Sequence, residues 1–207
     1  MTEAGVTDRR AKLALVTTAR RVHNSYQDYL RTLEISTVKL EYCDGEIYAM
    51  AGGTPAHADL AAAAIALLVG ALGPRCRVST SDLKVRVEAT DLSTFPDVSV
   101  VCGQRETSPI DANAVVNPTL LVEVTSPSTE DYDRGDKLSH YRQLPSLEAV
   151  LLVSHRRPEV TVVERVEGGW RETIARAGES IVVDALELSI PVDALYRGID
   201  LNGSSGA

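Results

Sequence analysis

Residues 119–129, TLLVEVTSPST, form an apolar run with one ionisable residue, Glu123, in its middle and an abrupt end at Ser-Pro-Ser. Short runs of branched apolar residues are typical of strands that helices cover on both faces. A second such run, PDVSVVC at 96–102, opens with Asp97 after Pro96, and a third, AVLLVS, follows at 149–154. The chain therefore predicts a buried sheet with helices on either side, in which two strands each carry an acid.

The remaining segments predict helices and hairpins around this sheet. Capping residues and apolar runs predict three helices. The first is capped by Ser25 and runs through Glu34, the second covers residues 56–72 before Gly73-Pro74, and the third covers residues 130–144 after Ser128 or Thr129. Asp44-Gly45 and Gly168-Gly169 predict hairpin turns. We expect an α/β (α+β) fold with a mixed sheet flanked by helices and extra hairpins. Residues 25–198 are expected to form one domain, with a partly disordered segment at 1–24 and a disordered tail at 199–207.

Composition limits the possible partners. The 207-residue chain has a net charge of −8, which favours solubility and works against a broad electrostatic grip on a phosphate backbone. Its three scattered cysteines include no CxxC pair, so neither a disulfide framework nor a zinc site is expected, and a reduced cytoplasm fits best. The start lacks a signal-peptide core, and the apolar run at 60–72 is too short to span a bilayer.

The two strand acids can form one site. Side chains alternate along a strand, so Glu123 points to one side of the sheet near the end of its strand, whereas Asp97 starts its own strand. If these strands are adjacent and antiparallel, the two carboxylates converge. Because two ionised carboxylates repel each other, either the pKa of one of them rises or a cation lies between them. Hard oxygen ligands favour Mg²⁺ or Mn²⁺ as that cation. Such a metal ion supports phosphodiester hydrolysis.

The predicted helix at 130–144 supplies a positive charge. Asp133, Lys137 and Tyr141 follow one another at intervals of four residues and so lie on one helical stripe. If this stripe faces the acids, Lys137 can orient an attacking water or neutralise charge on the phosphate. Tyr141 can then hold the lysine or contact the substrate.

Together these segments resemble a known family. The strings DGEIYAMAGGTPAHADL, PDVSVV and LLVEVTSPSTEDYDRGDKLSHYRQL are similar to the Uma-type restriction endonuclease family of the PD-(D/E)XK nuclease superfamily, and the resemblance covers roughly residues 27–196. It implies a restriction-endonuclease-like core and a nuclease site that depends on Mg²⁺ or Mn²⁺ and acts on nucleic acid, expected to be DNA. It also fits a homodimer, because nucleases that cut both strands often pair two sites.

The resemblance assigns roles to individual positions. It makes Asp97 and Glu123 the metal-binding acids, and Glu46 a third ligand or a supporting catalytic group. The chain departs from the superfamily pattern at Thr125, where a lysine is expected; Lys137 is the candidate that replaces it. We expect substrate contacts from three residues: Thr125, Tyr141 and Lys84, the last as part of a basic rim with Arg75, Arg77 and Arg86. His57 also occupies a position similar to one in the family.

Other interpretations remain open. Asp97 could cap backbone donors at a strand start, Glu123 could form a structural pair with an arginine or lysine, and Lys137 could be a solvated helix charge. At the level of function, the alternatives are a catalytically inactive nuclease-fold binding or regulatory module, and a hydrolase that uses the two acids without metal. The net charge of −8 supports the first of these.

Overall fold

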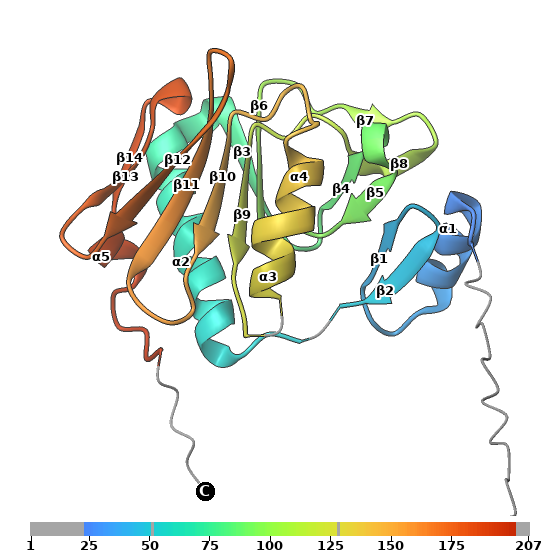
Figure 1. The fold of residues 1–207 in the computed structure, drawn as a ribbon, viewed down its shortest axis with the longest axis horizontal. Coiled ribbons are helices and arrows are strands. Elements are labelled where there is room, and N and C mark those ends of the chain that lie inside the picture. The colour runs from blue at the N-terminus through green and yellow to red at the C-terminus, as the bar shows by residue number, and fades with distance from the viewer. Residues whose placement is uncertain (1–22, 51, 128, 202–207) are drawn as a thin grey trace, which may run out of the picture.

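A six-stranded mixed sheet forms the centre of the computed structural model, which describes residues 23–50, 52–127 and 129–201 (Figure 1). In sheet order its strands are β12 (Gly169–Arg176), β11 (Glu159–Val166), β10 (Ala149–Val153), β9 (Leu120–Val124), β6 (Val98–Cys102) and β3 (Cys76–Thr80). β9 runs parallel to β10 and antiparallel to β6. The predicted mixed sheet is therefore confirmed, and the two strands that carry the acids are neighbours.

Helices cover both faces of this sheet, as the apolar runs predicted. Helix α2 (Pro55–Leu72) lies on one face of the sheet (Figure 1). It buries a stripe of leucine and alanine there, in one core with Val98 and Val122. On the other face, Leu121 packs with Leu138 and Tyr141 of a second helical segment. The alternation along β9 therefore directs even-numbered residues to α2 and odd-numbered residues to the second helix.

The second helical segment is continuous but irregular. It comprises α3 (Glu130–Tyr132), a π-helical turn (Asp133–Lys137) and α4 (Leu138–Tyr141), and so ends three residues before the predicted Leu144. Ser128, one of the two predicted caps, lies outside the described residues. A π-helical turn changes the direction of the side chains on either side of it. Here the turn contains the two charged residues of the predicted stripe, Asp133 and Lys137.

A second six-stranded sheet lies beside the first. In sheet order its strands are β2 (Glu46–Ala49), β1 (Leu40–Cys43), β5 (Leu92–Thr94), β4 (Lys84–Val87), β8 (Asp111–Val115) and β7 (Thr107–Ser108). The predicted turn at Asp44 and Gly45 is confirmed: both residues have positive φ, and Cys43 pairs with Glu46. Helix α1 (Tyr26–Ile35), capped by Ser25 as predicted, packs on this sheet through Tyr26 and Tyr29.

The C-terminal part of the chain covers the far side of α2. The predicted hairpin of β11 and β12 is present, but its turn lies at Glu167 and Gly168 rather than at Gly168 and Gly169, because Val166 pairs with Gly169. The strands β13 (Ser180–Val183) and β14 (Leu188–Pro191) and the helix α5 (Val192–Leu195) then contribute to the core around α2. Ile199, in the predicted tail, packs against the same core, whereas residues 202–207 lie outside the described part.

One prediction from the cysteines was wrong. Cys76 and Cys102 face each other in the register of β3 and β6 and form a disulfide. Their spacing along the chain does not indicate this bond, because only the antiparallel pairing of two distant strands brings the two cysteines together. Separately, residues 55–75 form one helical stretch that is long and apolar enough to cross a membrane by length and composition alone. A core helix passes the same test, and α2 packs on the sheet.

Candidate active site

The two strand acids lie at the same edge of the central sheet. Val98 of β6 faces Val122 of β9, so Asp97, just before β6, is next to the end of β9 that carries Glu123. The backbone N–H of Val124 donates a hydrogen bond of 2.8 Å to Asp97 Oδ2. The antiparallel pairing required by the sequence argument is therefore present, and it brings both acids to one end of the pair of strands.

Glu123 is buried and paired with Lys137. The ammonium of Lys137 lies 2.9 Å from Glu123 Oε1, and both residues are only 4% exposed. The hydroxyl of Tyr141 donates a hydrogen bond of 2.5 Å to the same oxygen. The stripe of the helical segment thus faces the acids, and Lys137 is not a solvated helix charge.

Two more carboxylates surround the lysine. Glu41 Oε1 lies 3.6 Å and Asp133 Oδ1 lies 3.7 Å from Lys137 Nζ, and both acids are buried. Glu41 belongs to β1 of the second sheet, where it also accepts a hydrogen bond from the Thr94 hydroxyl. The site therefore joins the two sheets through Lys137, because the carboxylates that share its ammonium come from both.

Glu41 is the site residue that the sequence argument missed. The hairpin register puts Glu41 and Glu46 on one face, so the pattern alone could not distinguish between them. In the structure Glu41 reaches Lys137, whereas Glu46 lies at the strand start and accepts a hydrogen bond from the Tyr48 hydroxyl. Burial of Glu41 by the second sheet decides between the two acids, and that sheet contact is not visible in local sequence.

Burial and crowding of negative charge shape the electrostatics of the cluster. Burial raises the pKa of Glu123 to about 8; Asp97 and Asp133 add to this rise, and the Lys137 ammonium opposes it. Burial also raises the pKa of Asp133. For Lys137, burial alone would lower the pKa, but Glu123 and the other anionic groups outweigh it and hold the pKa well above its usual value, so the ammonium stays charged.

On the other side of Asp97 lies His57. Thr54 caps α2, and the imidazole of His57, in the first turn, lies with Nε2 3.2 Å from Asp97 Oδ2. The hydrogen bond to Asp97 is the main cause of a raised pKa of His57, against a smaller opposing effect of burial. The family-like position of His57 thus corresponds to a direct contact with one of the two strand acids.

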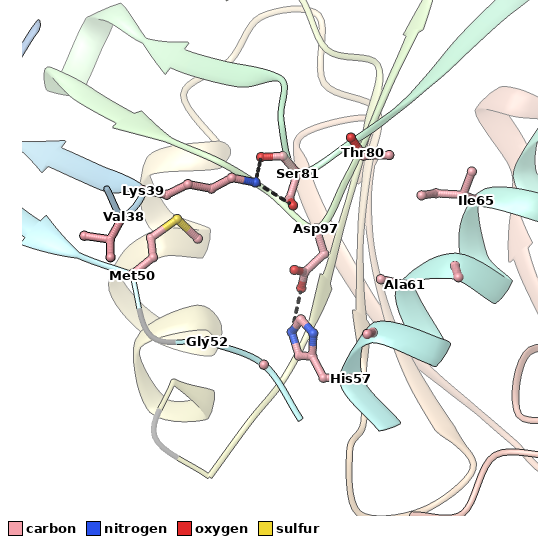
Figure 2. Close-up of a pocket in the computed structure, with 13 residues that line it drawn as sticks. Val38, Lys39, Met50, Gly52, His57, Ala61, Ile65, Thr80, Ser81 and Asp97 are labelled. Atoms are coloured by element: carbon pink, nitrogen blue, oxygen red, sulfur yellow. Dashed lines mark hydrogen bonds and ion pairs between the residues drawn. The ribbon is translucent and has the colours of Figure 1, made fainter. Parts of the chain in front are cut away.

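A cleft of about 570 Å³ opens onto this histidine and acid. Figure 2 shows α2 forming one wall with Ala61 and Ile65, while Val38 and Met50 lie across from it. Its lining is mostly apolar. At the rim, the ammonium of Lys39 donates hydrogen bonds to Ser81, and His57 points at Asp97 (Figure 2). The cleft gives a small molecule or a chain segment access to Asp97 from solvent.

Two of the predicted substrate-contacting residues lie elsewhere. Thr125 is fully buried after β9, where its hydroxyl contacts the Val153 carbonyl and His155 Nδ1. Lys84 is buried in the second sheet, with its ammonium 2.6 Å from Asp111 Oδ2. The third, Tyr141, joins the cluster through Glu123. Arg86, predicted to share a rim with Lys84, is likewise buried in the second sheet.

The oxygen donors fit a hard divalent cation. Mg²⁺ is usually held by one or two carboxylates with water completing the octahedron, and Asp97 and Glu123 provide such a pair next to further acids. Within the described residues, no group of three or more histidine, cysteine or acidic side chains is arranged to hold a metal ion. The carboxylate oxygens at this edge of the sheet are thus of the kind that suits Mg²⁺ or Mn²⁺.

Comparisons with known proteins identify the family. Residues 26–193 match the model of the Uma2 family, described as "Putative restriction endonuclease". Two proteins of Synechocystis sp. (strain ATCC 27184 / PCC 6803 / Kazusa) are similar to the chain: "Uncharacterized protein slr1290", 37% identical over 84% of this chain and 92% of that protein, and "Uncharacterized protein sll1609", 32% identical over 61% and 72%.

A solved structure shares the fold. The crystal structure of "a putative nuclease belonging to DUF820" from Anabaena variabilis ATCC 29413 superposes with a TM-score of 0.68 at 17% identity, covering 82% of this chain and 96% of that one. The expected nuclease-like fold is thus confirmed. With the family model covering most of the sequence, the chain belongs to the Uma2 family of restriction-endonuclease-like proteins.

Proposed function

We propose that the protein is a metal-dependent nuclease that hydrolyses phosphodiester bonds in nucleic acid, with DNA as the substrate. The observation that carries this proposal is the buried pair of Glu123 and Lys137 at the edge where Asp97 meets the same strand. Burying several carboxylates around one ammonium is costly to stability. A function that needs both the acids and the lysine explains why they are gathered there.

Asp97 and Glu123 are the residues that would hold Mg²⁺ or Mn²⁺. When bound between such acids, the ion supplies Lewis-acid chemistry: it lowers the pKa of water and neutralises charge on a phosphate oxygen. The protein must then keep both carboxylates turned to one place. The Val124 N–H fixes Asp97, and the Tyr141 hydroxyl fixes Glu123.

Lys137 is the group that acts on the reacting atoms. Its ammonium would orient the attacking water through a hydrogen bond and stabilise negative charge that develops on the phosphate. Glu41 and Asp133 keep it charged and hold its position, because they attract it from two further directions. In this proposal Glu41 takes the supporting role that the family resemblance assigned to Glu46.

The cleft beside α2 is the proposed route of the substrate to Asp97. Its apolar wall suits a sugar or base, while the scissile phosphate would lie at the acids near His57.

We further propose a homodimer in which two such sites cut both strands, and sedimentation of the purified protein tests this. The proposal also includes the cytoplasmic location expected from the sequence, although the Cys76–Cys102 disulfide is more usual in an oxidising compartment.

A plasmid-nicking assay tests the proposed activity. Wild-type protein with Mn²⁺ is expected to nick or linearise plasmid DNA, and excess chelator should stop the reaction. Glu123→Gln and Lys137→Met should each lose at least about a hundredfold in rate, in line with the loss of one charge-stabilising group. Cleavage that survives the chelator would point instead to a hydrolase that uses the acids without metal.

A second candidate is a binding module that retains the fold without turnover. The specific observation in its favour is that Lys137 and Tyr141 both already contact Glu123 Oε1, which leaves this oxygen engaged within the protein. Absence of cleavage on plasmid, single-stranded DNA and RNA, together with no Mg²⁺ binding, would support this candidate over the nuclease.

A further inference from the structure

We propose that four arginines at the edge of the central sheet bind the phosphodiester backbone of the substrate beside the cleavage site. The cluster is made of Arg134, Arg156, Arg157 and Arg176, and we call it the arginine cluster. This inference rests on the proposed nuclease function and goes beyond it, because it assigns the surface that holds the nucleic acid. Because the chain has a net charge of −8, binding of a phosphate backbone calls for a local group of positive side chains.

The arginine cluster is organised by two glutamates. Glu130 pairs with Arg134 at 3.3 Å and with Arg156 at 2.9 Å. Glu159 in turn pairs with Arg157 at 2.9 Å and with Arg176 at 3.2 Å. Four guanidinium groups thus share two carboxylates, so these six side chains carry a formal charge of +2 before the neighbouring Asp131 and Glu179 are counted.

The glutamates leave donors available for a ligand. A guanidinium has five N–H donors in a planar fork, and one carboxylate engages at most two of them. The side chains of Arg156 and Arg157 are 61% and 67% exposed, so their remaining donors face solvent. Fork-shaped donors suit phosphate oxygens, and an arginine already held by a carboxylate loses less conformational entropy when it binds.

The arginine cluster is close to the proposed site along two paths. Arg134 directly follows Asp133, which contacts Lys137. Arg156 and Arg157 lie on the turn between β10 and β11, and β10 pairs with β9 so that Leu152 faces Glu123. His155 of the same turn contacts the Thr125 hydroxyl at 3.0 Å. Figure 1 shows this turn and the start of α3 at the edge where β9 and β10 end.

The charge is greatest at the end of the cluster nearest to the turn. Glu179 accepts a hydrogen bond from the backbone N–H of Arg176 and lowers the local charge there. Asp131 is exposed next to Glu130 on α3 and has a similar effect on that side. The two exposed arginines of the turn, Arg156 and Arg157, are therefore the ones expected to make the main phosphate contacts.

The test compares two double variants in binding to labelled oligonucleotides. Arg156→Ala/Arg157→Ala removes the turn arginines but leaves Arg134 on Glu130 and Arg176 on Glu159, so no carboxylate of the cluster loses all its partners. The control, Arg31→Ala/Arg197→Ala, removes the same charge from exposed positions outside the cluster. Fluorescence anisotropy in Ca²⁺ then measures affinity against salt for single-stranded DNA, duplex DNA and RNA of one sequence, and thermal melting checks the fold.

The expected result is a smaller salt dependence in the cluster variant alone. Each lost phosphate contact lowers the slope of log affinity against log salt by about 0.9 for duplex DNA or about 0.7 for a single strand, so the loss should be about 1.8 or about 1.4. Among the three oligonucleotides, the one that shows this loss identifies the substrate class. The inference is overturned if the wild type binds but the cluster variant has the same slope of log affinity against log salt as the wild type. It is also overturned if both double variants change that slope equally. Either result would leave the nuclease proposal standing. A wild-type protein that binds and cleaves none of them would overturn both.

Discussion

Replacing Lys137 by methionine removes the ammonium shared by three buried carboxylates while keeping a side chain of similar length. In the structure this ammonium lies 2.9 Å from Glu123, 3.6 Å from Glu41 and 3.7 Å from Asp133, and all four residues are buried. Breaking a buried pair by removing one partner costs about 3–5 kcal/mol, because the remaining charge is left uncompensated. We expect Lys137→Met to lower the free energy of unfolding by an amount in this range.

Part of this loss in the free energy of unfolding should be recovered when Glu123, the nearest partner of Lys137, is also neutralised. Glu123→Gln in the Lys137→Met background removes the uncompensated charge, and the amide can still accept the Tyr141 hydrogen bond. The double variant should therefore be more stable than Lys137→Met by about 1–3 kcal/mol, the range for coupled neighbours. Urea denaturation of wild type, both single variants and the double variant gives the full cycle at pH 9, where Glu123, with its pKa of about 8, is ionised in the wild type. The reasoning is refuted if Lys137→Met unfolds within about 0.5 kcal/mol of wild type, which is typical of a surface substitution.

Three further predictions concern other parts of the fold. Burial alone would raise the pKa of Asp111, but hydrogen bonds from Lys84 and Tyr26 outweigh burial and lower it. The ionised form of Asp111 therefore stabilises the fold above about pH 4, and this stabilisation is lost as the pH falls through the folded-state pKa. Asp111→Asn should thus be less stable than wild type at pH 7 by urea denaturation, with the difference shrinking below pH 4; a constant difference would count against this. Gly45→Ala should lower stability by about 1 kcal/mol, because Gly45 has a φ of +84° and an added Cβ would meet the His23 ring; thermal melting with no change would argue otherwise. Ala61→Phe should fill the cleft and block cleavage while Mg²⁺ binding, measured by calorimetry, persists; full activity would exclude the cleft as the substrate route.

Strand-level features of the site could be predicted from sequence. The apolar runs around Asp97 and Glu123 predicted two buried strands, and the interval of four residues predicted that Lys137 and Tyr141 share a helix face. These inferences succeed because both depend on local periodicity. The same holds for the hairpin at Gly45, whose turn type is fixed by adjacent residues.

Contacts between distant elements could not be predicted in the same way. Glu41 reaches Lys137 because the second sheet packs against the helical segment, and the sequence gives no local sign of that packing. Lys84 reads as an accessible rim residue in an alternating strand, yet Asp111 from β8 pairs with it in the interior. The Cys76–Cys102 disulfide depends on strand pairing in the same way. In each case tertiary contacts decided the environment.

The central claim is that Asp97 and Glu123 hold a hard divalent cation together. Crystals of the protein soaked in Mn²⁺ and measured for anomalous scattering test it most directly. The account predicts one anomalous peak with an oxygen from each acid at about 2.1 Å, and no peak in Glu123→Gln crystals under the same soak. Wild-type crystals with Glu123 still bound to Lys137 and no anomalous density between the two acids would contradict it.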